Sequence, residues 1–545
     1  MVGAVGTATN VVPVAPSASE TSRRVSMAWV AVLGIMLVSL GLECWAIPRD
    51  LPYASEVDEP KVVRPAVHTA ATGDLNPHWF GNPASTTIYP LAGLYHVWDA
   101  AAHGGPLVSS NPDLAHRFAT SPGEFFVLGR LLSIAFAVAV IPLIFLLGRR
   151  CFSTGVGLVA AFFWALVPLA VLYGRIARSD SAAVFFTVLA LLLIVRVLDH
   201  PTLRNQVLAG LSVGVGVSSR YFLVTLGPVL VAAGVLAIRR NRRGASFGGV
   251  GAGVGAAVVG FVLTTPYFLF DWATARHNIE IEMGPHPGHD GFSRLGNLRW
   301  YLGNAIPNVI SWPIALLAVA GVVLVLMRRR DLRQLLLLAA GVIFLVGVST
   351  SELHWDRWPL PILPVVLLFA AYALVAAASV VHAHSSRIAL VPATVVGLAL
   401  VSILPAKDVV QLNLLQSRPS TRMVAREWIG AHVPSGSIMV KEQKTAPLHG
   451  MDLQVEYNKA LPDGGWTLDR YRRDSFQYLM TNGAISGAYT TQPHRYPTEA
   501  DFYRQLRQQA CLLREFRPSS HRYGPIIRVY ELMPAGAGCG ASAPS

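Results

Sequence analysis

The sequence predicts an α-helical membrane protein with many spans and a small α/β domain outside the membrane. Charged residues make up only 14% of its 545 residues and its mean hydropathy is +0.46, whereas soluble chains carry about 25% charged residues. The apolar residues come in uninterrupted blocks of the length that crosses a bilayer, about 18 residues or more. After residue 405 the hydropathy falls, and the sequence there fits an amphipathic helix and short strands.

About eleven blocks fit the span template. They lie at 26–47, 124–148, 154–173, 181–198, 205–219, 221–238, 246–268, 302–327, 333–349, 358–380 and 388–405. The division of 205–238 is the least certain, since a re-entrant pair is an alternative. The first block has a basic flank but is too long for a signal-peptide core, so we expect a retained span. Residues 1–25 are rich in Ala, Thr, Ser and Val, which predicts disorder.

The arginines of the short loops indicate the orientation. With a cytoplasmic N-terminus, the clusters at 149–150, 239–243 and 328–333 all fall on the cytoplasmic side, which is where Lys and Arg accumulate. The long loop 48–123 and the C-terminal domain, 406–545, then lie outside the membrane, and residues 26–405 form the transmembrane domain. The C-terminal domain is expected to be α/β, with an amphipathic helix and a strand within 421–443 and further strands at 476–481 and 524–533.

The net charge of +13 does not indicate a nucleic-acid partner. The basic residues of the chain lie in short clusters between apolar blocks and do not form a continuous basic face. The four cysteines show no C-x-x-C spacing, so a structural zinc site is not expected. Cys511 and Cys539 could pair in an oxidising compartment or remain two free thiols, and the sequence leaves both alternatives open.

The outer side collects nearly all the ionisable residues at the membrane edge. Charged groups at this depth are costly, so they tend to face a cavity and mark function. The acidic pair Asp58–Glu59 follows the first span, although a solvated loop pair beside Lys61 is the alternative. A carboxylate partly withdrawn from water can act as a general base. The arginines that oppose the charge rule predict a phosphate or acidic partner; the candidate phosphate-binding residues are Arg175, Arg178, Arg220, Tyr221 and Arg357.

Several of these residues have simpler explanations. Arg175 and Arg178 share a face only if their turn is helical. Asp180 opens the next span and could be a helix N-cap. Trp355 and Trp358 could be interfacial anchors beside Arg357.

A divalent metal ion is a candidate cofactor. The loop 278–292 gathers imidazoles and carboxylates, which are suitable ligands. Its spacing matches no firm ligand pattern, so a flexible acceptor-binding loop is favoured over a metal site. The candidate ligands are Glu282, His286, His289 and His354.

An ordered series of motifs carries a family resemblance. The segment "VDEPKVVRPAVHTAATGDLNPHWFGNPASTTIYPLAGLY" resembles the first outer loop of GT-C glycosyltransferases. "LYGRIARSDSAAVFFTVLAL", "AGLSVGVGVSSRYFLVTLGP", "TTPYFLFD" and "DRWPLPILP" follow in the same order. The chain is most similar to the protein O-mannosyltransferase-like, phospholipid-carrier-dependent branch, which includes the lipid A aminoarabinose transferases. Trp358 departs from the common tyrosine, and Ser85–Thr86 departs from the usual "PSL".

The resemblance implies a bacterial plasma-membrane enzyme that transfers a sugar from a polyprenyl-phosphate donor, with inversion, to a glycan, lipid or protein acceptor. Asp58 matches the catalytic aspartate that deprotonates the acceptor hydroxyl, and Glu59 is expected to orient the acceptor or the base. Arg178, Arg220 and Arg357 match donor-phosphate ligands. Asp180, Lys61 and Asp271 are expected to support the site.

A secondary transporter or lipid-carrier flippase is the rival hypothesis. Transporters usually carry internal repeats and place ionisable residues at the bilayer midplane. Here no clear repeat is found, and the ionisable residues gather at one membrane face. A membrane-anchored binding protein would leave the outer arginines unexplained. These patterns favour the enzyme.

Overall fold

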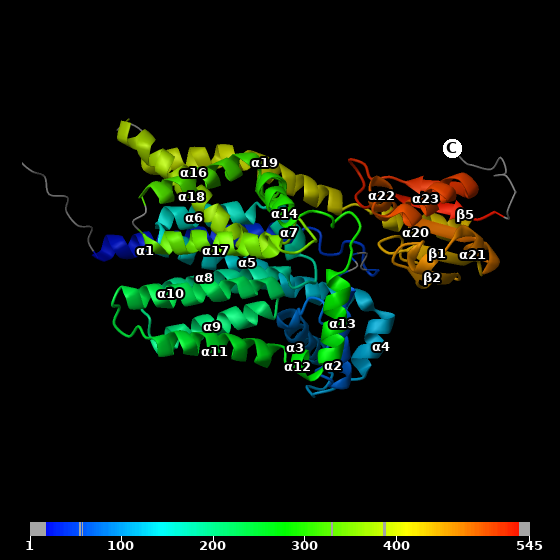
Figure 1. The fold of residues 1–545 in the computed structure, drawn as a ribbon, viewed down its shortest axis with the longest axis horizontal. Coiled ribbons are helices and arrows are strands. Elements are labelled where there is room, and N and C mark those ends of the chain that lie inside the picture. The colour runs from blue at the N-terminus through cyan, green and yellow to red at the C-terminus, as the bar shows by residue number, and fades with distance from the viewer. Residues whose placement is uncertain (1–17, 54–55, 57, 329–330, 385–388, 534–545) are drawn as a thin grey trace, which may run out of the picture.

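The computed structural model describes residues 18–53, 56, 58–328, 331–384 and 389–533. Long helices run side by side in a bundle, and a separate α/β domain lies beyond one end of it (Figure 1). This arrangement confirms the predicted fold class. The first helix, α1 (Ala18–Cys44), begins inside the segment expected to be disordered, and residues 1–17 lie outside the described part.

All eleven predicted spans fall on helices. By length and composition, eight helices of the described residues could cross a membrane, or nine if the bent pair α6–α7 is one span. Helices α9 and α16, with 15 and 17 residues, are shorter than a full span, so the count of eleven stays a prediction. The bundle helices are α1, α5 (Pro122–Cys151), α6 (Thr154–Ala165), α7 (Pro168–Gly174), α8 (Asp180–Asp199), α9 (Leu203–Val217), η1 (Tyr221–Thr225), α10 (Leu226–Arg239), α11 (Phe247–Thr264), α16 (Trp312–Arg328), α17 (Leu332–Ser349), η3 (Leu360–Ile362), α18 (Leu363–His384) and α19 (Leu390–Gln416).

Two predicted spans are not continuous helices. The helix axis bends by 65° between α6 and α7, where Pro168 lacks the N–H that would continue the helix. The segment 302–327 is divided into η2 (Tyr301–Ala305), α15 (Ile306–Ile310) and α16, with Ser311 at a φ of 73° between the last two. A positive φ interrupts a right-handed helix, so the prediction of one helix over 302–327 was wrong.

The outer loop 48–123 is a folded subdomain. Its helices α2 (Pro60–Thr72), α3 (Ser85–His103) and α4 (Asp113–Thr120) enclose a core of their own, built from residues such as Val63, Ile88 and Tyr95. They lie with α12 (Tyr267–Phe270) and α13 (Trp272–Met283) at the end of the bundle that faces the C-terminal domain (Figure 1). The short helix α14 (Arg294–Trp300) follows this group in the chain. The loops that carry the predicted site therefore meet at one end.

The C-terminal domain contains a five-stranded mixed sheet in the order β2-β1-β3-β5-β4. Strand β1 pairs parallel with β2 and β3, whereas β5 pairs antiparallel with β3 and β4. The strands are β1 (Ile438–Glu442), β2 (Gln454–Asn458), β3 (Tyr478–Asn482), β4 (Cys511–Phe516) and β5 (Ile527–Glu531), and the helices are α20 (Thr421–His432), η4 (Asp463–Gly465), α21 (Leu468–Arg473), α22 (Gly483–Thr491) and α23 (Pro497–Gln509).

The predicted amphipathic helix corresponds to α20, and the predicted strands correspond to β1, β3 and β5. Strands β2 and β4 were not expected. Four of the five residues of β2 are exposed and give no alternating pattern. The last bundle helix, α19, continues to Gln416, so the first residues of the segment 406–545 extend that helix. Cys44 and Cys151 are free thiols, and Cys511 is disulfide-bonded. Cys539, whose pairing with Cys511 was one of the two alternatives, lies outside the described residues.

Candidate active site

The centre of the site is an ion pair between Asp58 and Arg178. Asp58 lies in the turn before α2, and its Oδ2 accepts a hydrogen bond from Arg178 Nη1 at 2.5 Å. Arg178 lies between α7 and α8 and is almost fully buried. The Asp58 side chain keeps 30% of its surface exposed. The pair therefore joins the outer loop to the second outer turn and leaves part of the carboxylate accessible.

Asp180 connects this pair to a second arginine. Its Oδ2 lies 3.0 Å from Arg178 Nε, and its Oδ1 lies 2.8 Å from Arg220 Nη2. All three side chains are buried. Ser179 occupies the N-cap position of α8, so Asp180 bridges two guanidinium groups and the alternative of an N-cap was wrong.

A cavity of about 240 Å³ opens beside these residues. Arg220, Tyr221 and Arg357 line it together with Asp58. The Tyr221 hydroxyl donates to the carbonyl of Phe80 at 2.7 Å, which fixes the ring against the outer loop. Gly347 and Val348 of α17 also line the cavity, so it borders the bundle.

The charge of Arg357 is less neutralised than the charges of Arg178 and Arg220. Its guanidinium lies 4.4 Å from the centre of the Trp355 ring and forms no ion pair with any described residue. A partly buried guanidinium without a carboxylate partner is a preformed ligand for an anion, because its fork matches phosphate or carboxylate oxygens.

The local charges keep Asp58 ionised. Burial alone would raise the pKa of Asp58, but Arg178, Arg357, Lys61 and Lys444 outweigh it and hold that pKa well below its usual range. The effects on Arg178 have the opposite signs. Burial alone would lower the pKa of Arg178, but Asp180 and Asp58 raise it above its usual value. The site thus holds a fixed carboxylate among permanent cations.

Lys61 links Asp58 to α13. Its Nζ lies 3.6 Å from Asp58 Oδ1 and 2.7 Å from Glu282 Oε1, and 4.7 Å from the centre of the Trp79 ring. The predicted supporting residue Lys61 therefore lies between two carboxylates, where it neutralises both.

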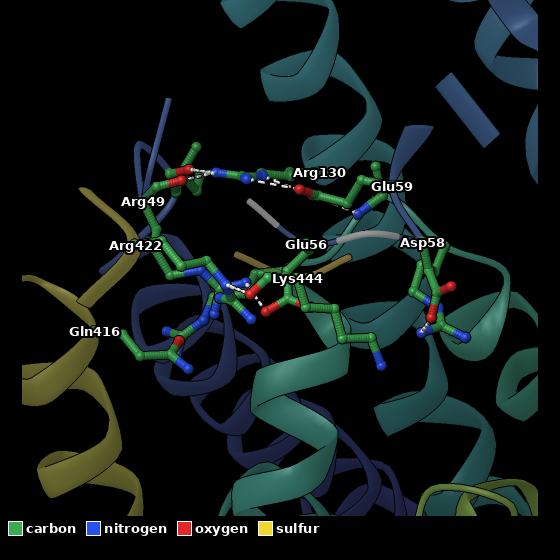
Figure 2. Close-up of polar contacts among 12 residues, drawn as sticks. Arg49, Glu56, Asp58, Glu59, Arg130, Gln416, Arg422 and Lys444 are labelled. Atoms are coloured by element: carbon green, nitrogen blue, oxygen red, sulfur yellow. Dashed lines mark hydrogen bonds and ion pairs between the residues drawn. The ribbon is translucent and has the colours of Figure 1, made fainter. Parts of the chain in front are cut away.

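Glu59 is turned away from the cavity. It is fully buried, and its carboxylate accepts bonds from Arg130 Nε and Nη2, each at 2.8 Å, and from the Ala177 amide at 3.1 Å. Arg130 also donates to the carbonyl of Arg49 at 2.9 Å. Figure 2 shows this pair on one side of the turn and Asp58 on the other. Glu59 can orient Asp58 only through the backbone.

Arg175 and Asp271 also lie outside the cavity lining. The segment between α7 and α8 is not helical, so Arg175 and Arg178 do not share a helical face. Arg175 donates to Asn413, and to Gln416 Oε1 at 2.6 Å, and thereby holds the end of α19. Asp271 caps α13 and accepts from Asn76 Nδ2 at 2.9 Å.

The candidate metal ligands are dispersed. Glu282 and His286 line the cavity, whereas the His289 ring stacks on Trp355 and the His354 ring stacks on Phe292. Burial and nearby cations lower the pKa of His289 to about 4. Among the described residues, the three-residue group close enough to share an ion is His68, Asp74 and His78, on the exposed surface of the outer loop.

The sequence analysis missed two residues that the structure brings to the site. Lys444, in the turn after β1, reaches from the C-terminal domain to within 6.0 Å of the Trp355 ring centre. Burial lowers its pKa, an effect that Asp58 partly offsets. Glu56 lies between the cations of this region and contacts Arg49 at 3.6 Å (Figure 2). No sequence signal pointed to Lys444, because its contact depends on how the C-terminal domain docks.

Comparisons with known proteins show which family model and which folds the chain resembles. The family model for dolichyl-phosphate-mannose-protein mannosyltransferases matches residues 123–270. The structure of ArnT from Cupriavidus metallidurans bound to undecaprenyl phosphate superposes with a TM-score of 0.52 at 14% identity, covering 95% of this chain and all of that one. The chain therefore shares the GT-C fold, and its residues 123–270 match this family model.

A second solved structure shares this fold. The oligosaccharyltransferase AglB from Archaeoglobus fulgidus, in complex with an inhibitory peptide and a dolichol-phosphate, gives a TM-score of 0.50 at 11% identity, covering 92% of this chain and 74% of that one. No curated protein matches the chain in sequence. The predicted resemblance and enzyme class are thus confirmed.

Proposed function

We propose that this glycosyltransferase moves a sugar from a polyprenyl-phosphate donor to an acceptor hydroxyl, with Asp58 as general base and inversion at the anomeric carbon. One observation carries the proposal. Three segments far apart in the chain place Asp58, Arg220 and Arg357 around one cavity at the end of a membrane bundle. Arg178, from a fourth segment, forms an ion pair with Asp58 beside it. An anionic base facing a cationic cradle suits this displacement, because charges fixed in advance need no reorganisation during the reaction.

The donor phosphate is assigned to Arg220 and Arg357. The cavity that they line borders α17, so a polyprenyl chain can stay in the bilayer while its phosphate reaches the guanidinium groups. Arg357 brings an uncompensated charge, and Tyr221 closes the wall beside Arg220. The lipid phosphates named in the ArnT and AglB structures support a lipid-phosphate-linked donor.

In the proposed step, the acceptor oxygen attacks the anomeric carbon while its proton passes to a carboxylate oxygen of Asp58. The bond between the anomeric carbon and the phosphate oxygen breaks, and its electron pair leaves with the polyprenyl phosphate. Arg220 and Arg357 stabilise the charge that develops on the departing phosphate. A single displacement with no glycosyl-enzyme intermediate inverts the anomeric centre.

Binding of the donor increases the basicity of Asp58. A permanently ionised carboxylate among cations is a weak base, since its pKa lies well below its usual range. A phosphate bound by Arg220 and Arg357 brings negative charge close to Asp58 and offsets the nearby cations. Binding of the donor therefore raises the pKa of Asp58. The base is thus strengthened when the donor is in place.

The remaining residues act around this centre. Asp180 holds Arg178 and Arg220 in place, and Lys61 fixes Asp58 against Glu282. Lys61 Nζ lies between these two carboxylates and offsets the charge of both. If a metal takes part, Glu282 and His286 are the candidate ligands that line the cavity. We therefore assign to Lys61 the charge neutralisation that a metal would supply.

The orientation is proposed from the loop charges. The loop between α10 and α11, which carries the cluster 239–243, lies at the end of the bundle away from the C-terminal domain (Figure 1). A bacterial plasma membrane with a cytoplasmic N-terminus and an external C-terminal domain fits this distribution. An impermeant maleimide should label Arg473→Cys on intact cells and Arg242→Cys only after lysis.

The function is tested with purified protein in vesicles, using a polyprenyl-phosphate donor labelled in the sugar. Release of labelled sugar from the lipid, to a hydroxyl acceptor or to water, supports the glycosyl transfer. Movement of the intact labelled lipid across the bilayer without cleavage would support the flippase and refute the proposed reaction. Analysis of the product anomer tests inversion separately.

A further inference from the structure

A second and larger cavity lies on the other side of Asp58. It has a volume of about 800 Å³, within the range of ligand-binding clefts. One wall is the first turns of α2 together with Tyr53, and the other is formed by β1, the loop after it and β2 of the C-terminal domain. We call it the interdomain cleft.

The interdomain cleft is lined by cations. Lys61 and Arg64 come from α2, and Lys441, Lys444 and His449 come from the C-terminal domain. No Asp or Glu is among the described residues that line it. Concave surfaces lined by one sign of charge concentrate the field and attract a ligand of the opposite sign.

Two of these cations have no carboxylate partner among the described residues. Arg64 is exposed and forms no ion pair there, and the Lys441 ammonium donates only to the carbonyl of Ala446, at 2.6 Å. Burial, with Arg426 and Arg422 nearby, lowers the pKa of Lys441 to about 8. Burial, with Arg426, Lys441 and Arg64 nearby, lowers the pKa of His449. Such uncompensated crowding of cations is unfavourable unless an anion binds among them.

The interdomain cleft reaches the proposed base. Lys61 lines it and lies 3.6 Å from Asp58 Oδ1. The Lys444 side chain extends from the C-terminal domain toward Asp58 (Figure 2). Asp58 itself lines the smaller cavity with Arg220 and Arg357. The carboxylate thus stands between two spaces, as required when the nucleophile and the leaving group approach from opposite sides.

The interdomain cleft does not border the described part of the helix bundle. All the residues that line this cleft belong to the outer loop or to the C-terminal domain, and none belongs to a bundle helix of the described part of the chain. The smaller cavity, in contrast, borders α17. The two cavities therefore differ in their access to the membrane.

We propose that the interdomain cleft is the acceptor site and that the acceptor carries an anionic group, a phosphate or a carboxylate, near the hydroxyl that is glycosylated. This assignment rests on the proposed function. It gives the C-terminal domain a direct role, because Lys441, Lys444 and His449 bind the anionic group while the hydroxyl is presented to Asp58.

The experiment measures binding and does not require turnover. The full-length protein is placed in phosphatidylcholine nanodiscs and saturated with polyprenyl phosphate, which fills the donor cavity. Sodium tripolyphosphate is then titrated in by calorimetry. We expect the double variant Arg64→Ala/Lys441→Met to bind this probe at least tenfold more weakly than the wild type, because two charge-assisted contacts are lost.

The matched control is Arg473→Ala, which removes an exposed arginine on α21 of the same domain, outside the cleft lining. Its affinity should stay within twofold of the wild type. Equal affinity of the double variant and the wild type, or no binding by the donor-saturated wild type, would overturn the assignment. Binding without any sugar release would leave the acceptor site standing and count against the proposed reaction instead.

A second titration distinguishes an anionic group on a membrane lipid from one on a water-soluble acceptor. Phosphatidylglycerol is introduced into the nanodiscs, and the titration is repeated. Loss of tripolyphosphate binding would show that an anionic lipid headgroup reaches the interdomain cleft and would support a lipid-borne acceptor. Unchanged binding would support an anionic glycan or another acceptor presented from the aqueous side.

Discussion

Substitution of Arg357 by alanine should weaken donor binding and leave the fold intact. Arg357 has no ion-pair partner among the described residues, and its main contact is the face of Trp355 at 4.4 Å. Loss of that contact costs about 0.5–1 kcal/mol of folding free energy. Loss of a charge-assisted bond to the donor phosphate costs about 1.5–3 kcal/mol, which corresponds to roughly a 10- to 150-fold increase in the donor Kd.

Calorimetric titration of the variants with polyprenyl phosphate provides the assay. Arg357→Lys keeps the charge but loses the planar fork, so its Kd should lie between those of the wild type and the alanine variant. Arg178→Ala is the contrasting variant, because it leaves Asp58 and Asp180 without their shared partner and should lower the melting temperature markedly. An Arg357→Ala protein that binds polyprenyl phosphate within twofold of the wild type would refute the assignment of the donor phosphate.

The buried pair of Glu59 and Arg130 should be structural: Glu59→Gln should destabilise the protein by about 3–5 kcal/mol in thermal unfolding, and the apolar double variant Glu59→Leu/Arg130→Met should destabilise it less than either single change. Chelation by EDTA should leave the transfer rate within twofold, because Lys61 already neutralises Asp58 and Glu282; complete loss with recovery on adding Mg²⁺ or Mn²⁺ would contradict this. Burial raises the pKa of Glu442 from 4.5 to about 7. The folded domain therefore holds this proton more tightly than the unfolded chain does, so stability should be greatest below about pH 4.5 and fall by about 3 kcal/mol as the pH rises to 7. Hydrogen exchange of the β1 amides in the full-length protein measures this fall, which Glu442→Gln should abolish.

Hydropathy and loop charge predicted much of the fold, because membrane helices obey simple rules of length and polarity. Continuous helices such as α5 and α8 matched their predicted segments closely. The breaks at Leu166–Val167 and Ser311 were missed, since averaging over a window hides a single proline or a single positive φ. Strand β2 was missed because its residues are mostly exposed.

The candidate site was predicted in part. Asp58, Arg178, Arg220 and Arg357 were expected at one membrane face. The structure places Asp58, Arg220 and Arg357 around one cavity and pairs Arg178 with Asp58. The sequence could not separate Asp58 from its neighbour Glu59, because two adjacent carboxylates in a loop carry no sign of which one faces the cavity. Their different partners are seen only in three dimensions.

The same limit applies to the arginines and to the C-terminal domain. Arg175 and Arg178 were grouped by helical spacing, but the segment that joins α7 to α8 is not helical and directs the two side chains to different partners. Lys444 reaches the site through the docking of a separate domain. Its local sequence after β1 contains no signal of that contact.

The central claim is that Asp58 removes the acceptor proton, and single-turnover transfer by Asp58→Asn tests it most directly. The amide cannot accept the proton, so the rate of transfer from bound donor should fall by about 10²- to 10⁴-fold, while the Kd for polyprenyl phosphate stays within about threefold of the wild type. Transfer by Asp58→Asn at more than a tenth of the wild-type rate, with the donor bound equally well, would show that another group takes the proton.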